Sequence, residues 1–177
     1  KRLVACVQAL QRLDSKAVLT CKVDARRLTI DTKEAHFTMQ LGSGSFPAMR
    51  DMLAKLPLSS TTLMVERQAL IEAIRFVQLG EGGILLDIRS GAEELFIANV
   101  DRKTGENETS LLATISGVPL KIVLDDHYLL DYLQGCKKSS KVELRFRGQT
   151  TPVNCIPDGE AEGSSYWLAP RYWAGVA

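Results

Sequence analysis

The sequence predicts an α+β protein built from repeated β-α-β-β-β units. The first observation is the succession of patterns in residues 120–172: a β-rich run, an amphipathic helix and three strand-like runs. The second is that residues 61–116 repeat this succession, and residues 1–41 repeat it without the leading strand. Self-similarity of this kind indicates a repeat architecture, in which each copy is one supersecondary unit.

The last unit begins with Leu120–Leu124, a short β-rich run. Asp125 or Asp126 can cap the helix that follows, because their side chains accept hydrogen bonds from the first free backbone N–H groups. The helix ends at Gly135 and carries Leu129, Leu130 and Leu133. The later strands of this unit are expected at Lys141–Phe146, Thr151–Ile156 and Ser165–Ala169.

The middle unit has strand Thr61–Val65 and a helix over Glu66–Gln78. Apolar residues recur along that helix at the spacing of one face, namely Leu70, Ile71, Ile74 and Val77. Its further strands are Ile84–Arg89, Glu94–Asn99 and Thr109–Ser116. The first unit reads as helix Leu3–Leu13 with strands Ala17–Val23, Arg27–Asp31 and His36–Leu41, an antiparallel meander.

Because the first unit lacks its leading strand, we expect that an upstream portion is missing. Pro57 and the run Leu58–Ser60 read as a linker between two domains. We therefore expect an incomplete domain over residues 1–57, a complete domain over residues 58–172, and a tail over residues 173–177.

The composition is that of a globular protein, with 45% hydrophobic residues, 24% charged residues and a net charge of +1 in 177 residues. No apolar run approaches the length that spans a membrane, and the first residues do not have a signal-peptide layout. The four cysteines, Cys6, Cys21, Cys136 and Cys155, form no CxxC pair. We expect reduced, structural thiols in a cytoplasmic protein, with no metal and no cofactor.

Enzymatic motifs are absent from the sequence, which contains no nucleophile elbow, zincin motif or dinucleotide fingerprint. The run Asp125-Asp126-His127 could suggest a metal or acid–base site. Neighbouring residues at a helix start point in different directions, however, and capping would explain both aspartates. We therefore expect a protein without catalytic residues.

Three segments resemble the bacterial sliding clamp, the β subunit of DNA polymerase III. They are Gly44–Pro47 (GSFP), Tyr128–Leu133 (YLLDYL) and Tyr166–Arg171 (YWLAPR), in that order along the chain. The resemblance implies the DNA-clamp fold, with antiparallel sheets outside and helices on the inner face. Residues 1–57 would be the second half of a clamp middle domain, and residues 58–172 the C-terminal domain.

The resemblance also implies a non-catalytic processivity factor, a ring of two head-to-tail subunits that encloses double-stranded DNA without reading its sequence. Basic residues on the helices would face the DNA, and this chain offers Lys1, Arg2, Arg12, Arg67, Arg75, Lys137 and Lys138. Glu66 and Glu72 dilute the charge of the second helix. Contacts to phosphates would therefore be weak and dependent on salt.

The second implied site is an apolar pocket between the middle and last domains, which accepts short peptides from polymerase subunits, the clamp loader and other clients. Pro47 and Met52 match its middle-domain wall, and Trp167, Leu168, Ala169, Pro170 and Arg171 match its C-terminal strand. Arg171 departs from the family, which has a soft apolar residue there. The other wall of the pocket, from the earlier half of the middle domain, is not in this chain.

A second class of function stays open: a clamp-like effector module of a transcriptional regulator with a DNA-binding domain upstream. The upstream sequence separates the two readings. More copies of the repeat would support a clamp, and a short helix-turn-helix would support a regulator.

Overall fold

The computed structural model describes residues 19–24, 26–33, 35–42, 48–78, 83–100, 105–159 and 166–172. The chain divides into two compact units, Lys1–Met49 and Arg50–Ala177. The domain boundary expected after residue 57 stays a prediction. The first unit contains β1 (Thr20–Val23), β2 (Arg27–Asp31) and β3 (His36–Gln40). They form the antiparallel meander that the alternation predicted, around the buried Ile30. The predicted helix Leu3–Leu13 lies outside the described residues.

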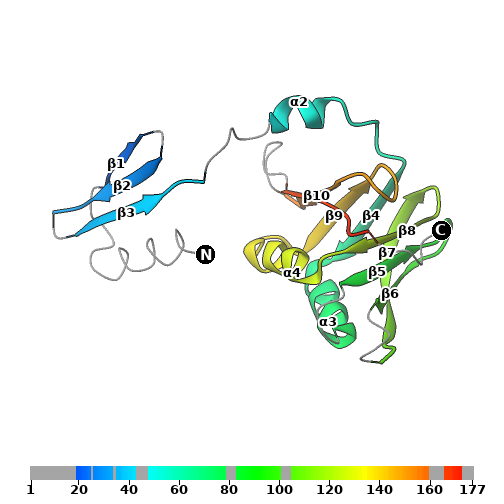
Figure 1. Cartoon of the computed structure of the whole chain (residues 1–177). Coiled ribbons are helices and arrows are strands. Elements are labelled where there is room, and N and C mark those ends of the chain that lie inside the picture. The colour runs from blue at the N-terminus through cyan, green and yellow to red at the C-terminus, as the bar shows by residue number, and fades with distance from the viewer. Residues whose placement is uncertain are drawn as a thin grey trace. The chain divides into compact units, whose positions relative to one another are not determined.

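The second unit follows the predicted succession of elements (Figure 1). Its first repeat comprises β4 (Thr61–Glu66), α3 (Arg67–Val77), β5 (Ile84–Ile88), β6 (Glu94–Asn99) and β7 (Glu108–Gly117). Its second repeat comprises β8 (Leu120–Leu124), α4 (Asp126–Gly135), β9 (Lys141–Phe146), β10 (Val153–Pro157) and β11 (Tyr166–Leu168). The short helix α2 (Met49–Ala54) begins where the first unit ends, and the sequence analysis did not predict it. A helix of this length has too few residues to display a periodic apolar face.

The two repeats share one antiparallel sheet with the strand order β11-β10-β9-β4-β7-β6-β5-β8. The sheet closes on itself: Leu124 of β8 bridges Pro170 just after β11, and the Arg171 N–H donates to the Val123 carbonyl at 2.8 Å. Each repeat pairs its leading strand with the other repeat, β4 with β9 and β8 with β5. The strand pairs of the two repeats are therefore related by an approximate two-fold symmetry, as the internal repetition of the sequence predicts.

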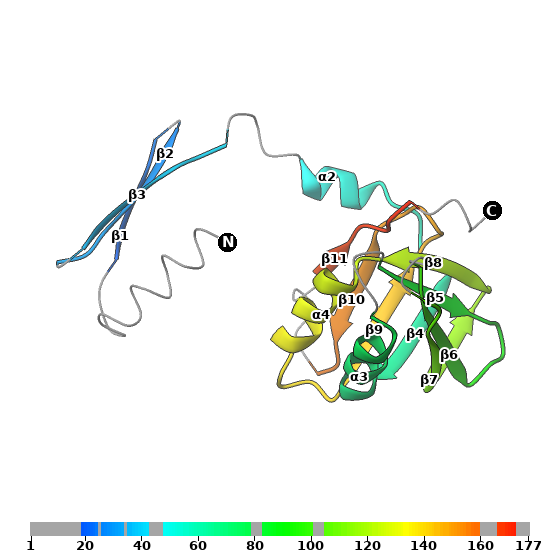
Figure 2. The ribbon, with the colours of Figure 1, turned by 60° about the horizontal axis from the view of Figure 1, so that its bottom comes forward.

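Both long helices pack on the core of this sheet and contact each other (Figures 1 and 2). The residues that α3 buries and those that α4 and its end bury occupy corresponding positions in the two repeats. In α3 they are Leu70, Ile71, Ile74 and Val77, and in the second repeat Leu129, Leu130, Leu133 and Cys136. Alternate residues of β4 and β5 face the same core, so the predicted helix faces and strand alternation are both confirmed.

Candidate functional site

The C-terminal segment, residues 166–172, crosses from one end of the sheet to the other. Over Tyr166–Leu168 it pairs with β10, in the register Val153↔Leu168 and Cys155↔Tyr166. Pro170 has no N–H to donate to a ladder, which favours a break in regular pairing at this point. Arg171 then donates its N–H to β8, so the segment links the last strand of the second repeat to that repeat's first strand.

The side chains of this segment have different environments. Leu168 is 4% exposed and belongs to the core, so it supports the fold from within. Trp167 is half-buried, and the Arg147 guanidinium lies 4.8 Å from its ring centroid, within the range of a cation–π contact. Ala169 is exposed, and Pro170 is half-buried. The accessible part of the predicted pocket strand therefore consists of Trp167, Ala169, Pro170 and Arg171.

Arg147 was not among the predicted site residues, yet it fixes the position of the C-terminal strand. Its Nε donates to the Pro57 carbonyl at 2.8 Å, so it ties the segment before β4 to Trp167. Burial lowers the pKa of Arg147, with a further contribution from the positive charge of Arg145, but an arginine stays protonated at neutral pH. The sequence signal was the alternation Arg145-Phe146-Arg147, which puts both arginines on the side away from the core, Arg145 within β9 and Arg147 just after its end.

Arg171 connects the C-terminal segment to the start of α4. Its Nη1 lies 3.6 Å from Oδ2 of Asp125. Asp125 is the N-terminal cap of α4 and accepts hydrogen bonds from the His127 N–H at 3.1 Å and the Tyr128 N–H at 3.2 Å. The ion pair between Arg171 and Asp125 therefore links the C-terminal segment to the start of α4.

A shallow groove of about 80 Å³, the C-terminal groove, lies where this segment meets β8 and the β9–β10 turn. Its lining includes Lys121, Val123, Gln149, Thr150, Arg171 and Tyr172. A wider groove of about 510 Å³, the β7 groove, occupies the corresponding position in the first repeat, between β4, the β5–β6 turn and β7. The two hollows follow from the same backbone arrangement, but their side chains differ.

The predicted middle-domain wall of the peptide pocket is only partly described. Met52 lies on α2 with 55% of its surface exposed. Pro47 lies outside the described residues. The convergence of these residues with the C-terminal strand therefore stays a prediction.

The predicted DNA-facing residues also separate into groups. Arg75 is exposed on α3, and Lys137 and Lys138 are exposed just after α4, whereas Lys1, Arg2 and Arg12 lie outside the described residues. Arg67 is half-buried: its Nε donates to the Ser139 carbonyl at 2.9 Å and its Nη1 to the Leu133 carbonyl at 3.1 Å. It therefore binds one carbonyl in the last turn of α4 and one in the turn before β9, and so joins the two repeats, a role that its place on a helix did not reveal.

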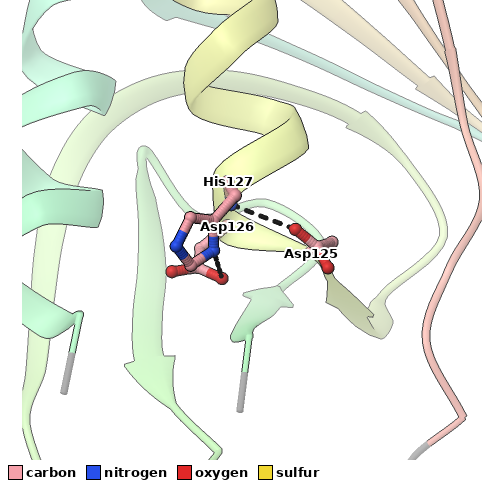
Figure 3. A group of neighbouring side chains, drawn as sticks. All are labelled: Asp125, Asp126 and His127. Carbon is pink, nitrogen blue, oxygen red and sulfur yellow. Dashed lines mark hydrogen bonds and ion pairs between the residues drawn. The ribbon is translucent and has the colours of Figure 1, made fainter. Parts of the chain in front are cut away.

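The cluster Asp125-Asp126-His127 is more compact than the sequence suggested (Figure 3). The atoms that could bind a metal lie within 4.8 Å of one another, although we expected them to diverge. Capping explains Asp125 but not Asp126, which corrects the second half of that prediction. Asp126 is 1% exposed, accepts a hydrogen bond from Nε2 of Gln78 and lies 3.2 Å from Nδ1 of His127. Its carboxylate joins the end of α3 to the start of α4, so a structural role accounts for its burial.

The three described cysteines are free thiols. Cys136 and Cys155 are buried, whereas Cys21 is exposed, like the other residues of β1. Burial, with the neighbouring Cys136, raises the pKa of Cys155 to about 12. This thiol stays protonated at neutral pH and is a poor nucleophile.

The described helices offer no apolar stretch of the length that crossing a membrane requires. Two β-α-β-β-β repeats that share one closed antiparallel sheet, with their helices in contact, define the class of fold: a DNA clamp. No sequence profile of a protein family matches the chain, and neither does a curated protein sequence. Comparison of structures gives a clear result.

The fold is that of the bacterial DNA polymerase III β subunit, the sliding clamp. The β subunit from Pseudomonas aeruginosa superposes with a TM-score of 0.73 at 22% sequence identity, over 94% of this chain and 46% of that chain. The clamp from Caulobacter crescentus gives 0.74 at 18% identity, over 94% and 45%. The β subunit from Thermotoga maritima gives 0.68 at 20%, over 88% and 42%. The chain spans about half the length of these clamps.

Proposed function

We propose that this chain is the latter part of a sliding clamp, a non-catalytic processivity factor that encloses duplex DNA and docks client proteins. On this proposal residues 1–57 complete a middle domain and residues 58–172 form the last domain. The observation that carries the proposal is that each repeat has one strand edge without a partner strand among the described residues, β7 in the first repeat and β11 in the second. The two edges occupy corresponding positions in a sheet that the helices α3 and α4 cover. This is the arrangement that a ring of like domains requires.

The first edge belongs to β7. Its first half pairs with β6 and its second half with β4. Asn107 accepts from the Asn99 N–H and Ala113 donates to the Glu93 carbonyl, so odd-numbered residues here point their backbone groups toward β6. The intervening Glu108 and Ser110 point theirs the other way, where the described residues provide no strand. Such an edge is a template for another chain.

Apolar surface accompanies this edge. Leu112 of β7 is 75% exposed. Phe76 of α3 is 61% exposed, and its carbonyl accepts from Nδ2 of Asn107, just before the strand. Strand addition with an apolar contact beside it is an established mode of association. It supports closure of the ring through the β7 edge by a second subunit.

The second edge belongs to β11. Tyr166–Leu168 pairs with β10 on one side, and β8 joins only after this strand has ended. Within the described residues the other side of β11 is open. By the symmetry of the repeats it corresponds to the β7 edge, which supports a neighbouring domain on that side as well. A domain with one available edge on each side can be a link in a ring.

Enclosure would make strong DNA contacts unnecessary. Arg75 and the pair Lys137-Lys138 are offset by Glu72 on α3 and Asp131 on α4, so the exposed helix surface has mixed charge. Binding to short linear duplex should therefore be weak, independent of sequence and lost as salt rises. Tight binding to one DNA sequence would instead favour the alternative function, a clamp-like module of a transcriptional regulator.

Client docking is tested by titrating a fluorescent peptide with a leucine-phenylalanine anchor against three proteins. They are this chain, this chain ended at Arg171, and the longer protein that includes the upstream sequence. We expect binding only to the longer protein, since the pocket needs a wall from the preceding half-domain. Binding gained by removing the tail would show that the tail occludes the pocket. No binding to any of them, with the longer protein folded, would refute the docking function.

A further inference from the structure

A chain of hydrogen bonds joins three side chains in the unit Lys1–Met49, namely Asp31 of β2 with His36 and Thr38 of β3. Oδ1 of Asp31 is bonded to Nδ1 of His36, and Nε2 of the same imidazole lies 3.1 Å from Oγ1 of Thr38. A hydroxyl within reach of a base, with the base oriented by a third group, is the arrangement that activates a nucleophile. We propose that Thr38 is an acyl-acceptor site, which takes the acyl group of a small thioester. This inference does not depend on the clamp function.

The backbone of the β2–β3 hairpin holds the three side chains together. Asp31 and His36 are paired directly across the two strands. The turn between them is closed by the Thr32 N–H, which donates to the Ala35 carbonyl at 2.8 Å. His36 and Thr38 are two residues apart on one strand, so their side chains lie on the same face of the sheet. This face is opposite to the one that carries the small core of the unit.

Hydrogen-bond chemistry fixes the direction of the chain. An ionised carboxylate only accepts hydrogen bonds, so Asp31 holds the imidazole proton on Nδ1. In the neutral imidazole Nε2 then carries the free electron pair and accepts from the Thr38 hydroxyl. In the opposite tautomer Nε2 would donate to Thr38, and the imidazole cannot then act as its base. His36 is therefore the base, and Asp31 is a positioning residue.

The reactive end of this chain is open to a small reactant. The His36 side chain is 66% exposed and Thr38 is exposed, whereas the Asp31 side chain is 32% exposed. The hydroxyl and its base therefore face solvent, and the carboxylate that orients the base is more enclosed. An open site of this kind favours a small donor that brings its own good leaving group, and an acyl thioester is such a donor.

The proposed step needs no redox partner. Oγ1 of Thr38 attacks the carbonyl carbon of the thioester while its proton passes to Nε2 of His36. The tetrahedral adduct collapses, the C–S bond breaks, and the imidazolium gives the proton to the departing thiolate. The products are one threonine ester and one thiol, and the imidazole is neutral again. A positioned base accelerates a step of this kind by about 10²–10⁴-fold.

Thr20 of β1 provides a matched control within the same molecule. It is paired directly with Asp31 across the two strands, so its side chain lies on the same face of the sheet as the Asp31 side chain. Thr20 is exposed like Thr38, and its hydroxyl has no hydrogen-bond partner in the part of the chain that the structure describes. The two threonines therefore differ chiefly in the imidazole beside Thr38.

The test incubates this chain with acetyl-coenzyme A and maps the acetyl groups by peptide mass spectrometry. Hydroxylamine treatment distinguishes the products, because it cleaves threonine esters and leaves lysine amides intact. We expect Thr38 to be acetylated at least about a hundredfold faster than Thr20. Unfolding in urea should abolish the difference. Because both threonines are measured in one unaltered protein, the comparison does not depend on how a variant folds.

Three variants assign the reactivity to the hydrogen-bonded chain. His36→Gln should lower the rate at Thr38 to that at Thr20, and Thr20→Val should leave it unchanged. Asp31→Asn should lower it in part, and the ¹⁵N spectrum of His36 should show the proton moving from Nδ1 toward Nε2, which a purely structural role for Asp31 would not produce.

Three results would overturn the proposal. Equal acetylation of Thr38 and Thr20 in the folded protein would show that the imidazole does not activate the hydroxyl. Acetyl groups confined to lysine amides would show that Thr38 is not an acceptor. Labelling of Thr38 that persists in His36→Gln would attribute the reactivity to exposure alone.

Discussion

Replacing Ile74 by alanine tests whether α3 packs through the face that the sequence and the structure assign to it. Ile74 is 0% exposed and lies in the core cluster with Leu70, Ile71 and Val77. Arg75, the next residue, is exposed at the last turn of the same helix. Two adjacent residues of one helix therefore provide a buried position and its matched surface control.

The magnitude follows from the cavity that the substitution leaves. Truncating a fully buried isoleucine to alanine costs about 2–5 kcal/mol, from lost transfer free energy and an unfilled cavity. The higher helix propensity of alanine offsets this by about 0.4 kcal/mol. We expect the free energy of unfolding to fall by about 3 kcal/mol, and Arg75→Ala to change it by less than about 0.5 kcal/mol.

The assay is urea unfolding followed by tryptophan fluorescence. Both tryptophans, Trp167 and Trp173, belong to the unit Arg50–Ala177, so the signal reports on that unit. The midpoint should shift in Ile74→Ala while the slope stays constant. Equal shifts for Ile74→Ala and Arg75→Ala would refute the assignment of the helix face.

Two further predictions concern the backbone and the thiols. Gly117 has φ +104°, and an added Cβ would lie 2.0 Å from the Ser60 carbonyl oxygen, so Gly117→Ala should lower the free energy of unfolding by at least about 3 kcal/mol. The control is Gly91→Ala, at φ +74° with nothing within 4 Å, which should cost only about 1–2 kcal/mol. Equal losses in urea titrations would contradict the close approach at Gly117. Iodoacetamide at pH 8 should label the exposed Cys21 and spare Cys155 until urea unfolds the protein, as read by peptide mass mapping. The reason is that burial raises the pKa of the Cys155 thiol from 9.0 to about 12, which leaves almost no thiolate in the folded protein. Rapid labelling of Cys155 in the native protein would contradict its burial.

Periodicity made the fold predictable from the sequence. Alternating apolar residues and helical spacing located both long helices and each strand that the structure describes in the unit Arg50–Ala177, because burial of one face imposes those periods. The short helix α2 escaped prediction, since six residues cannot show a helical period. The closure of the sheet at Pro170 was likewise invisible, because a single bridge between distant segments leaves no local pattern.

The site was less predictable, because its residues act through contacts between distant segments. Arg67 lies on a helix as expected, but its bonds to Leu133 and Ser139 depend on the packing of the second repeat. Asp126 looked like a cap and instead receives Gln78 from the other helix. Arg171 was identified as a departure from the clamp pattern, whereas its N–H bond to the Val123 carbonyl and its ion pair with Asp125 depend on the closure of the sheet.

The most direct test of the clamp proposal is retention on circular DNA. The longer protein that includes the upstream sequence is labelled, loaded onto a nicked plasmid by its clamp loader with ATP, and separated from free protein by gel filtration at moderate salt. We predict that it elutes with the circular plasmid and is released when a single cut makes the plasmid linear, because enclosure holds it and phosphate contacts are weak. Equal retention on circular and linear DNA, or retention that depends on one DNA sequence, would contradict the proposal.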